Sequence, residues 1–139
     1  MRTILSEVEK GDITGIRELL EDGFDINEKD CFWGTPLHLA VNYEKLKIIE
    51  LLLIEGADVN MVNAEGEPPI FMISSDNINL YKLLLVYGAD PNIKNYDGRT
   101  ILDKAYEENL TDIIILLKSY GAQSIIKPSD FGLSDETYQ

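Results

Sequence analysis

The feature that most constrains this chain is a short string that returns about every 33 residues. It reads DGFDIN, EGADVN, YGADPN and finally YGAQS, and its glycines are Gly23, Gly56, Gly88 and Gly121. The intervals between these glycines are 33, 32 and 33 residues. A period of this length predicts an array of similar units, each of which packs on its neighbours to complete one continuous core.

A second string keeps the same register. GTPLHLA contains Thr35, EPPIFMI has Pro68 at the matching place, and RTILDKA has Thr100, again at steps of 33 and 32 residues. A threonine hydroxyl can cap a new helix, and Pro36 suits the first helical position because an N–H there would have no partner. The string therefore predicts where the first helix of each unit begins.

A helical pattern lies between the two strings. KLKIIELLLIEG places Leu46, Ile49, Leu52 and Leu53 at the spacing of one helical face, and NLYKLLLVYG and TDIIILLKSYG repeat the pattern. Each helix is expected to end at the glycine, which adopts the left-handed conformation without steric cost. The predicted unit is a turn, a short helix, a second helix, a glycine stop and an extended loop.

This order of elements, together with TPLHLA, resembles the ankyrin repeat, whose period is 33 and whose signature contains T-P-L-H-x-A. The resemblance covers residues 1–123 and implies an all-α repeat (solenoid) fold of helix-turn-helix pairs with extended hairpin-like loops. The expected units are residues 1–29, 30–62, 63–94 and 95–123, followed by a C-terminal tail, 124–139, that partly caps the last unit.

The units follow the family pattern unequally. Unit two is nearest to it. Unit three has a Pro-Pro pair at 68–69, has Phe71 where unit two has histidine, and is one residue shorter before its second helix, so a shortened or shifted turn is expected there. Unit four has Ile101 in place of the proline and Asp103 in place of the histidine.

His38 is the only histidine in the chain. The resemblance implies that it is structural, bonding to backbone and tying neighbouring loops together. A His-based catalytic triad is then not expected, and a zinc site would have only His38 and Cys31 to draw on. The sequence predicts a protein that is not an enzyme and that holds no cofactor or metal; an enzyme using an acidic groove is the weaker alternative.

The charge of the chain narrows the choice of partner. Twenty-five acidic residues against 12 basic ones give a net charge of −13, which disfavours nucleic acid and favours basic proteins. The single cysteine offers no disulfide framework, and no apolar run approaches the ~20 residues of a membrane span. The expectation is a cytoplasmic protein, a monomer when free, that does not bind membranes.

The resemblance implies that partners bind the loop tips and the exposed side of each first helix. Transfer by repeat register gives the candidate partner-binding residues Phe32, Trp33, Asn42 and Tyr43 in unit two, Glu65, Glu67 and Asp76 in unit three, and Tyr96, Asp97, Glu107 and Glu108 in unit four. Trp33 takes the place at which units three and four have glycine. Two alternatives follow for it: an exposed aromatic anchor beside Phe32, or a side chain folded back over the apolar edge of the first unit.

Aromatic anchors with carboxylates around them predict a non-enzymatic module that binds a basic protein and inhibits it. The complex is expected to be tight and to weaken with added salt. An immunity protein that neutralises a basic toxin is one form of this hypothesis. The alternatives are a regulatory scaffold, a secreted effector ankyrin protein that binds a host or cellular enzyme, and a structural array that associates with itself.

Overall fold

The computed structural model describes residues 2–123, and within that range the secondary structure is entirely helical. Its elements are α1 (Ile4–Lys10), α2 (Ile13–Glu21), α3 (Pro36–Asn42), α4 (Leu46–Ile54), the 3-10 helix η1 (Pro69–Met72), α5 (Ile78–Val86), α6 (Ile101–Glu107) and α7 (Thr111–Ser119). The all-α repeat fold expected from the sequence is confirmed. The expected cap formed by residues 124–139 lies outside the described residues.

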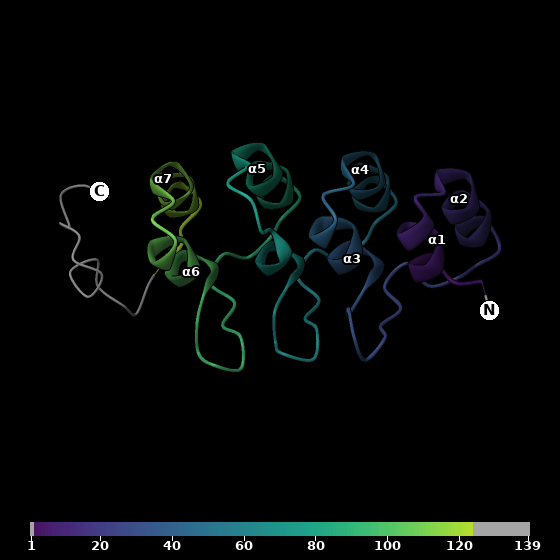
Figure 1. Cartoon of the computed structure of the whole chain (residues 1–139), viewed down its shortest axis with the longest axis horizontal. Coiled ribbons are helices and arrows are strands. Elements are labelled where there is room, and N and C mark those ends of the chain that lie inside the picture. Colours follow the sequence, from purple (N-terminus) through teal and green to yellow (C-terminus); the bar gives the residue numbers. More distant parts are fainter. Residues whose placement is uncertain (1, 124–139) are drawn as a thin grey trace. The chain divides into compact units, whose positions relative to one another are not determined.

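The chain divides into two compact units, Met1–Ser74 and Ser75–Gln139. In the first unit, α1 packs on α2 and α3, and α3 also packs on α4 and η1. The helices of this unit form two rows, α2 and α4 in one and α1 and α3 in the other, and the loop between α2 and α3 projects past the second row (Figure 1). In the second unit, α7 packs on both α5 and α6.

The first helix of a pair begins where the sequence predicts. The Thr35 hydroxyl accepts the N–H of His38 at the start of α3, and the Thr100 hydroxyl accepts the N–H of Asp103 at the start of α6, each at 3.3 Å. Before η1 the corresponding residue is Pro68, which provides no side-chain cap, and the helix is a single 3-10 turn of four residues. The departure expected in the third pair is therefore a shortened first helix.

The glycine stops also lie where they were predicted. Gly23, Gly56, Gly88 and Gly121 all have positive φ, between 88° and 98°. After α2, the N–H of Gly23 donates to the carbonyl of Leu20 and the N–H of Phe24 donates to that of Leu19. This pair of bonds satisfies carbonyls that the end of a helix would otherwise leave unpaired.

The predicted core face of α4 is wrong at one position. Ile49, Leu52 and Leu53 are buried as expected, but Leu46 is 51% exposed, and Ile48 is buried instead. Leu46 is the first residue of the helix. Side chains of a helix lean toward its N-terminus, so the side chain of the first residue projects off the end of the helix instead of onto its packed face.

Asparagines in the extended loops join successive loops. Asn27 Oδ1 accepts the N–H of Asp58 at 2.8 Å in the first unit, and Asn92 Oδ1 accepts the N–H of Gln123 at 2.8 Å in the second. Asn92 Nδ2 also donates to the carbonyl of Gly121 at 3.0 Å. These bonds fix the loop before α3 against the segment after α4 in the first unit, and the loop before α6 against the residues that follow α7 in the second.

Candidate functional site

The buried His38 connects two loops of the first unit. The Thr35 N–H and hydroxyl lie 3.1 and 2.8 Å from its Nδ1, and its Nε2 lies 2.7 Å from the carbonyl oxygen of Glu67. Because an amide N–H can only donate and a carbonyl can only accept, Nδ1 is the acceptor and Nε2 carries the proton. The structural role predicted for His38 is confirmed, since its ring joins the start of α3 to the next loop tip.

Burial sets the protonation state of this histidine. The pKa of His38 is lowered from its ordinary value, chiefly because the ring is desolvated, although the hydrogen bond to the Glu67 carbonyl acts in the opposite direction. The charge of Lys29 lowers the pKa further. The ring is therefore neutral near pH 7, as its two hydrogen bonds require.

The loop tip before α3 is held by Asp30. Its Oδ1 accepts the N–H groups of Phe32, Trp33 and Gly34 at 2.5–3.1 Å, and its own N–H donates to the carbonyl of Gly34. This carboxylate satisfies three consecutive backbone donors that point into the turn. The side chains of Cys31, Phe32 and Trp33 consequently lie on a tip whose backbone is held by these hydrogen bonds.

The left-handed residue of this turn is shifted by one position. The other loops use Gly66 (φ 78°) and Gly98 (φ 80°), whereas here Gly34 (φ 97°) has the positive φ and Trp33 does not. Trp33 therefore occupies the place that is glycine in the other loops without adopting a left-handed backbone. A Cβ on Gly34 would also lie only 2.9 Å from His38 Nδ1, so glycine is required there on two grounds.

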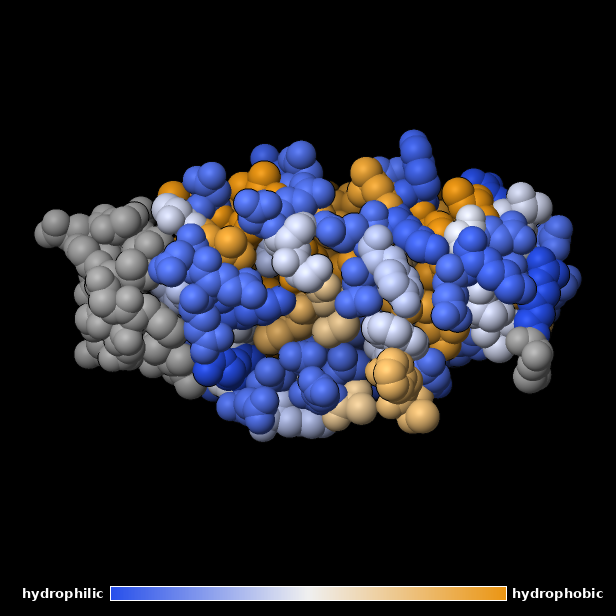
Figure 2. All heavy atoms as spheres, viewed as in Figure 1, coloured by the Kyte–Doolittle hydropathy of each residue, from blue (hydrophilic) through white to orange (hydrophobic). Residues whose placement is uncertain are grey.

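Three aromatic side chains form a cluster at this tip, here called the aromatic cluster: Phe32, Trp33 and Tyr43. The ring centroids of Phe32 and Trp33 are 5.1 Å apart in an edge-to-face arrangement, and those of Trp33 and Tyr43 are 5.8 Å apart. Phe32 is 78% exposed and Tyr43 46% exposed, while Trp33 between them is half-buried. Figure 2 shows apolar side chains gathered at the tip of the loop that precedes α3.

Phe32 and Trp33 separate two hollows of the first unit. The tip hollow, of about 400 Å³, is lined by both rings and by Cys31, Glu65, Glu67 and Met72, among others. The α1 hollow, of about 440 Å³, is lined by both rings and by Leu5, Ser6, Glu9 and Glu28, among others. Trp33 thus lies against the α1 hollow of the first helix pair, as in the folded-back alternative, but it stays only half-buried beside Phe32, as in the anchor alternative.

Several lining residues were missed by sequence reasoning. Leu5, Ser6 and Glu9 come from α1, and Met72 comes from the end of η1. Repeat register compares equivalent positions and does not indicate which neighbouring helix a bulky loop residue will contact. The one available signal was the tryptophan itself, because a large ring in place of glycine has to pack against an adjacent unit.

The remaining candidates of the first unit take different positions. Glu65 is exposed and Glu67 half-buried, both on the tip hollow. Asn42 is half-buried at the end of α3, directly before Tyr43. The first unit therefore brings the aromatic cluster together with two carboxylates.

The candidates of the second unit lie in separate places. Tyr96 is 75% exposed and Asp97 is exposed at a loop tip, while Glu107 and Glu108 are exposed at the end of α6. The Glu107 carboxylate forms an ion pair with the guanidinium of Arg99, which ties the loop to the helix.

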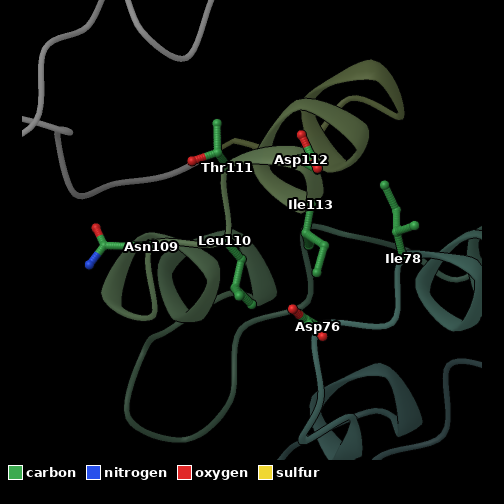
Figure 3. A pocket seen from close by; sticks show the side chains of 7 residues that line it. All are labelled: Asp76, Ile78, Asn109, Leu110, Thr111, Asp112 and Ile113. Carbon is green, nitrogen blue, oxygen red and sulfur yellow. The ribbon is translucent and has the colours of Figure 1, made fainter.

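Asp76, also exposed, lies on a smaller hollow of about 220 Å³ in the second unit. Leu110, directly before α7, and Ile113, in the first turn of α7, lie on the same hollow as Asp76 (Figure 3). This hollow has no aromatic lining residue. It lacks the combination of rings and carboxylates that marks the tip before α3.

Residues 2–123, which the structure describes, contain no group of three or more His, Cys, Asp or Glu side chains arranged to hold a metal ion. They also contain no helix that is both long enough and apolar enough to cross a membrane.

Stacked helix pairs, glycine stops and a histidine that braces successive loops define a helical repeat protein. The family model described as ankyrin repeats (3 copies) matches residues 4–95 and 37–127, and the chain belongs to this family. Ankyrin repeats generally mediate protein–protein interaction, and the family is typically non-enzymatic.

Curated relatives share part of this chain. It is 38% identical to the 2-5A-dependent ribonuclease of Mus musculus over 71 residues. The matched segment makes up 50% of this chain and 10% of that protein. The chain is 34% identical over 65 residues to a putative ankyrin repeat protein of fowlpox virus, 47% of this chain and 10% of that one. With human ankyrin repeat and SOCS box protein 5 it shares 42% identity over 60 residues, 43% of this chain and 18% of that protein. The chain therefore spans between a tenth and a fifth of the length of these relatives.

Proposed function

We propose that this protein is a non-enzymatic interaction module that binds a basic protein through the tip of the loop before α3. The observation that carries the proposal is the aromatic cluster, in which a strongly exposed Phe32 is supported by Trp33 on a turn held by hydrogen bonds. Exposed aromatic side chains held in one conformation lose little entropy on binding and are enriched among interface hot spots.

Charge supports a basic partner. The chain carries −13 overall, and Glu65 and Glu67 line the tip hollow together with Phe32 and Trp33. A negative field at an apolar anchor attracts a positively charged surface and accelerates encounter. A nucleic acid would be repelled by the same field.

We propose that binding inhibits the partner protein, because the bound module covers the part of the partner's surface that it contacts. An immunity protein that neutralises a basic toxin acts in this way. A regulatory scaffold or secreted effector that binds a host or cellular enzyme is the alternative, and a self-associating array is another. The exposed aromatic cluster favours a protein partner of any of these kinds over an enzyme's small substrate.

The proposal is tested by affinity capture. The wild-type chain and the variant Trp33→Ala/Tyr43→Ala are immobilised, native extract is passed over both, and retained proteins are identified by mass spectrometry. The matched control is Phe24→Ala/Tyr87→Ala, which removes two exposed aromatic rings outside the aromatic cluster. We expect the wild-type and control columns to retain a basic protein that the Trp33→Ala/Tyr43→Ala column does not retain. We also expect the free chain to inhibit the activity of that protein in stoichiometric proportion.

Two other results would count against the proposal. Equal retention on all three columns would move the binding surface away from the aromatic cluster. Retention of this chain alone, together with a size that grows with concentration, would favour the self-associating array.

A further inference from the structure

The α1 hollow, like the tip hollow, joins the rings of Phe32 and Trp33 to carboxylates, but it has three carboxylates in its lining where the tip hollow has two. Leu5 and the rings of Phe32 and Trp33 supply its apolar surface, and Glu9 and Glu28 add negative charge from the neighbouring helix and loop. Asp30 is a third carboxylate of the lining, and Lys29 is its one cation.

Two of the three carboxylates have a structural task. Asp30 Oδ1 accepts the three N–H groups of the turn, and Glu28 Oε1 accepts the N–H of Ile4 at 3.0 Å, which holds the loop to the start of α1. Glu9 is exposed near the end of α1. Its backbone carbonyl, with that of Val8, accepts from Lys45 Nζ, a cation that is not part of the lining. Glu9 is therefore the carboxylate best placed to meet an incoming group.

We infer that the α1 hollow receives an arginine side chain of the protein partner. This inference rests on the proposed function and specifies the chemistry by which the partner is recognised. A guanidinium is planar and weakly hydrated, so it can stack on the Trp33 ring while its N–H groups donate to Glu9. Its aliphatic stem covers Leu5 and Phe32.

Other occupants match the lining less well. An anion would meet three carboxylates, and an uncharged apolar side chain would leave the Glu9 carboxylate partly desolvated without a donor. A lysine ammonium carries the charge but lacks the flat face that stacks on an indole. The combination of ring and carboxylate therefore selects arginine.

Trp33 is the only tryptophan of the chain and lines both hollows, so its fluorescence reports binding at this tip and the Glu9 variant assigns the signal to the α1 hollow. The probe is N-acetyl-arginine amide, titrated into the full chain, and the matched control ligand is N-acetyl-citrulline amide, which has nearly the same shape and no charge. We expect a saturable change in Trp33 emission with a dissociation constant on the order of 1 mM for the arginine compound. We expect at least ~10-fold weaker binding for the citrulline compound, and intermediate binding for N-acetyl-lysine amide.

A pair of variants locates the site. Glu9→Gln is expected to weaken binding of the arginine compound about three- to ten-fold. Glu55→Gln removes the same charge from an exposed position after α4 and should change it by less than ~2-fold. Far-ultraviolet circular dichroism verifies that both variants retain the helical content of the wild type.

Three outcomes would overturn the inference. The first is no saturable change in Trp33 emission up to ~20 mM of the arginine compound, which is well above the expected dissociation constant. The second is equal affinity for the arginine and citrulline compounds, and the third is equal weakening of arginine binding by Glu9→Gln and Glu55→Gln. If partner capture still depends on Trp33 and Tyr43 in any of these cases, only the arginine site is rejected. If instead arginine binds as expected while partner capture ignores the aromatic cluster, the proposed function fails and the subsite stands.

Discussion

The imidazole of His38 donates from Nε2 to the carbonyl of Glu67 across 2.7 Å, and this buried bond joins the start of α3 to the next loop tip. Replacing His38 by alanine removes the hydrogen bonds that its ring makes to that carbonyl and to the Thr35 N–H, and it opens a cavity. We expect His38→Ala to lower the free energy of unfolding by about 2–4 kcal/mol. Urea unfolding followed by circular dichroism measures the loss, and the exposed Glu65→Ala should stay within about 0.5 kcal/mol of wild type.

The same histidine predicts a dependence of stability on pH. Because burial lowers the pKa of His38 below its ordinary value of 6.5, the unfolded chain binds the proton more readily than the folded one. The contribution of the neutral ring is complete above pH 6.5 and is lost as the pH falls from there toward the lower folded pKa. The difference in unfolding free energy between wild type and His38→Ala should therefore shrink across this window. A constant difference from pH 7.5 to about 5 would contradict the assignment.

Gly34 provides a test of the shifted turn. Gly34→Ala must tolerate both a positive φ of 97° and a Cβ at 2.9 Å from His38 Nδ1, whereas Gly98→Ala has φ 80° and no atom within 4 Å of its new Cβ. The backbone cost alone is about 1–2 kcal/mol. We expect the Gly34 variant to lose at least ~1 kcal/mol more than the Gly98 variant in thermal or urea unfolding. Equal losses would mean that the close approach to His38 is relaxed without cost.

Lys45 holds the end of α1 from the second helix pair. Its Nζ donates to the carbonyls of Val8 and Glu9 at 3.1 and 3.0 Å, where the negative end of the helix dipole lies. Lys45→Met keeps the aliphatic stem and removes the charge, and we expect a loss of about 1–2 kcal/mol. Lys47→Met, an exposed lysine of α4, is the control and should change stability by less than about 0.5 kcal/mol.

Association with the captured partner should depend on salt. If the carboxylates of the tip hollow steer a basic surface, the association rate should rise roughly ten-fold or more when ionic strength falls from about 0.5 M to about 0.05 M. Glu65→Gln/Glu67→Gln should reduce the association rate much more than it raises the dissociation rate. Stopped-flow measurement with Trp33 emission follows both rates. A rate that is flat across this range would contradict steering.

The repeat, the helix starts and the bracing histidine could be predicted because each depends on residues near in sequence or at a fixed repeat distance. Thr35 and Thr100 cap helices by contacts three residues away, and glycine stops follow from backbone sterics alone. His38 required only the comparison of its string with the family signature. Local rules were sufficient for these features.

The packing of the candidate site could not be predicted in the same way. The sequence shows that the glycine of the turn before α3 is shifted to Gly34, where the positive φ lies, but it does not show that Asp30 Oδ1 accepts three N–H groups of this turn. The contribution of α1 to the hollow, and the pairing of Arg99 with Glu107, depend on side chains that meet only after the helices pack. Equivalent register positions therefore predicted which residues are exposed more successfully than which residues meet.

Asp30 and Gly34 make the hydrogen bonds that close the turn before α3, and none of these bonds uses the side chain of residue 31, 32 or 33. Residues 31–33 can therefore be replaced together while Asp30 and Gly34 are kept on either side of them. A new tripeptide at this place would keep the backbone hydrogen bonds to Asp30 and would change the walls of both hollows, so partner choice could be altered at this tip without redesigning the repeats that support it.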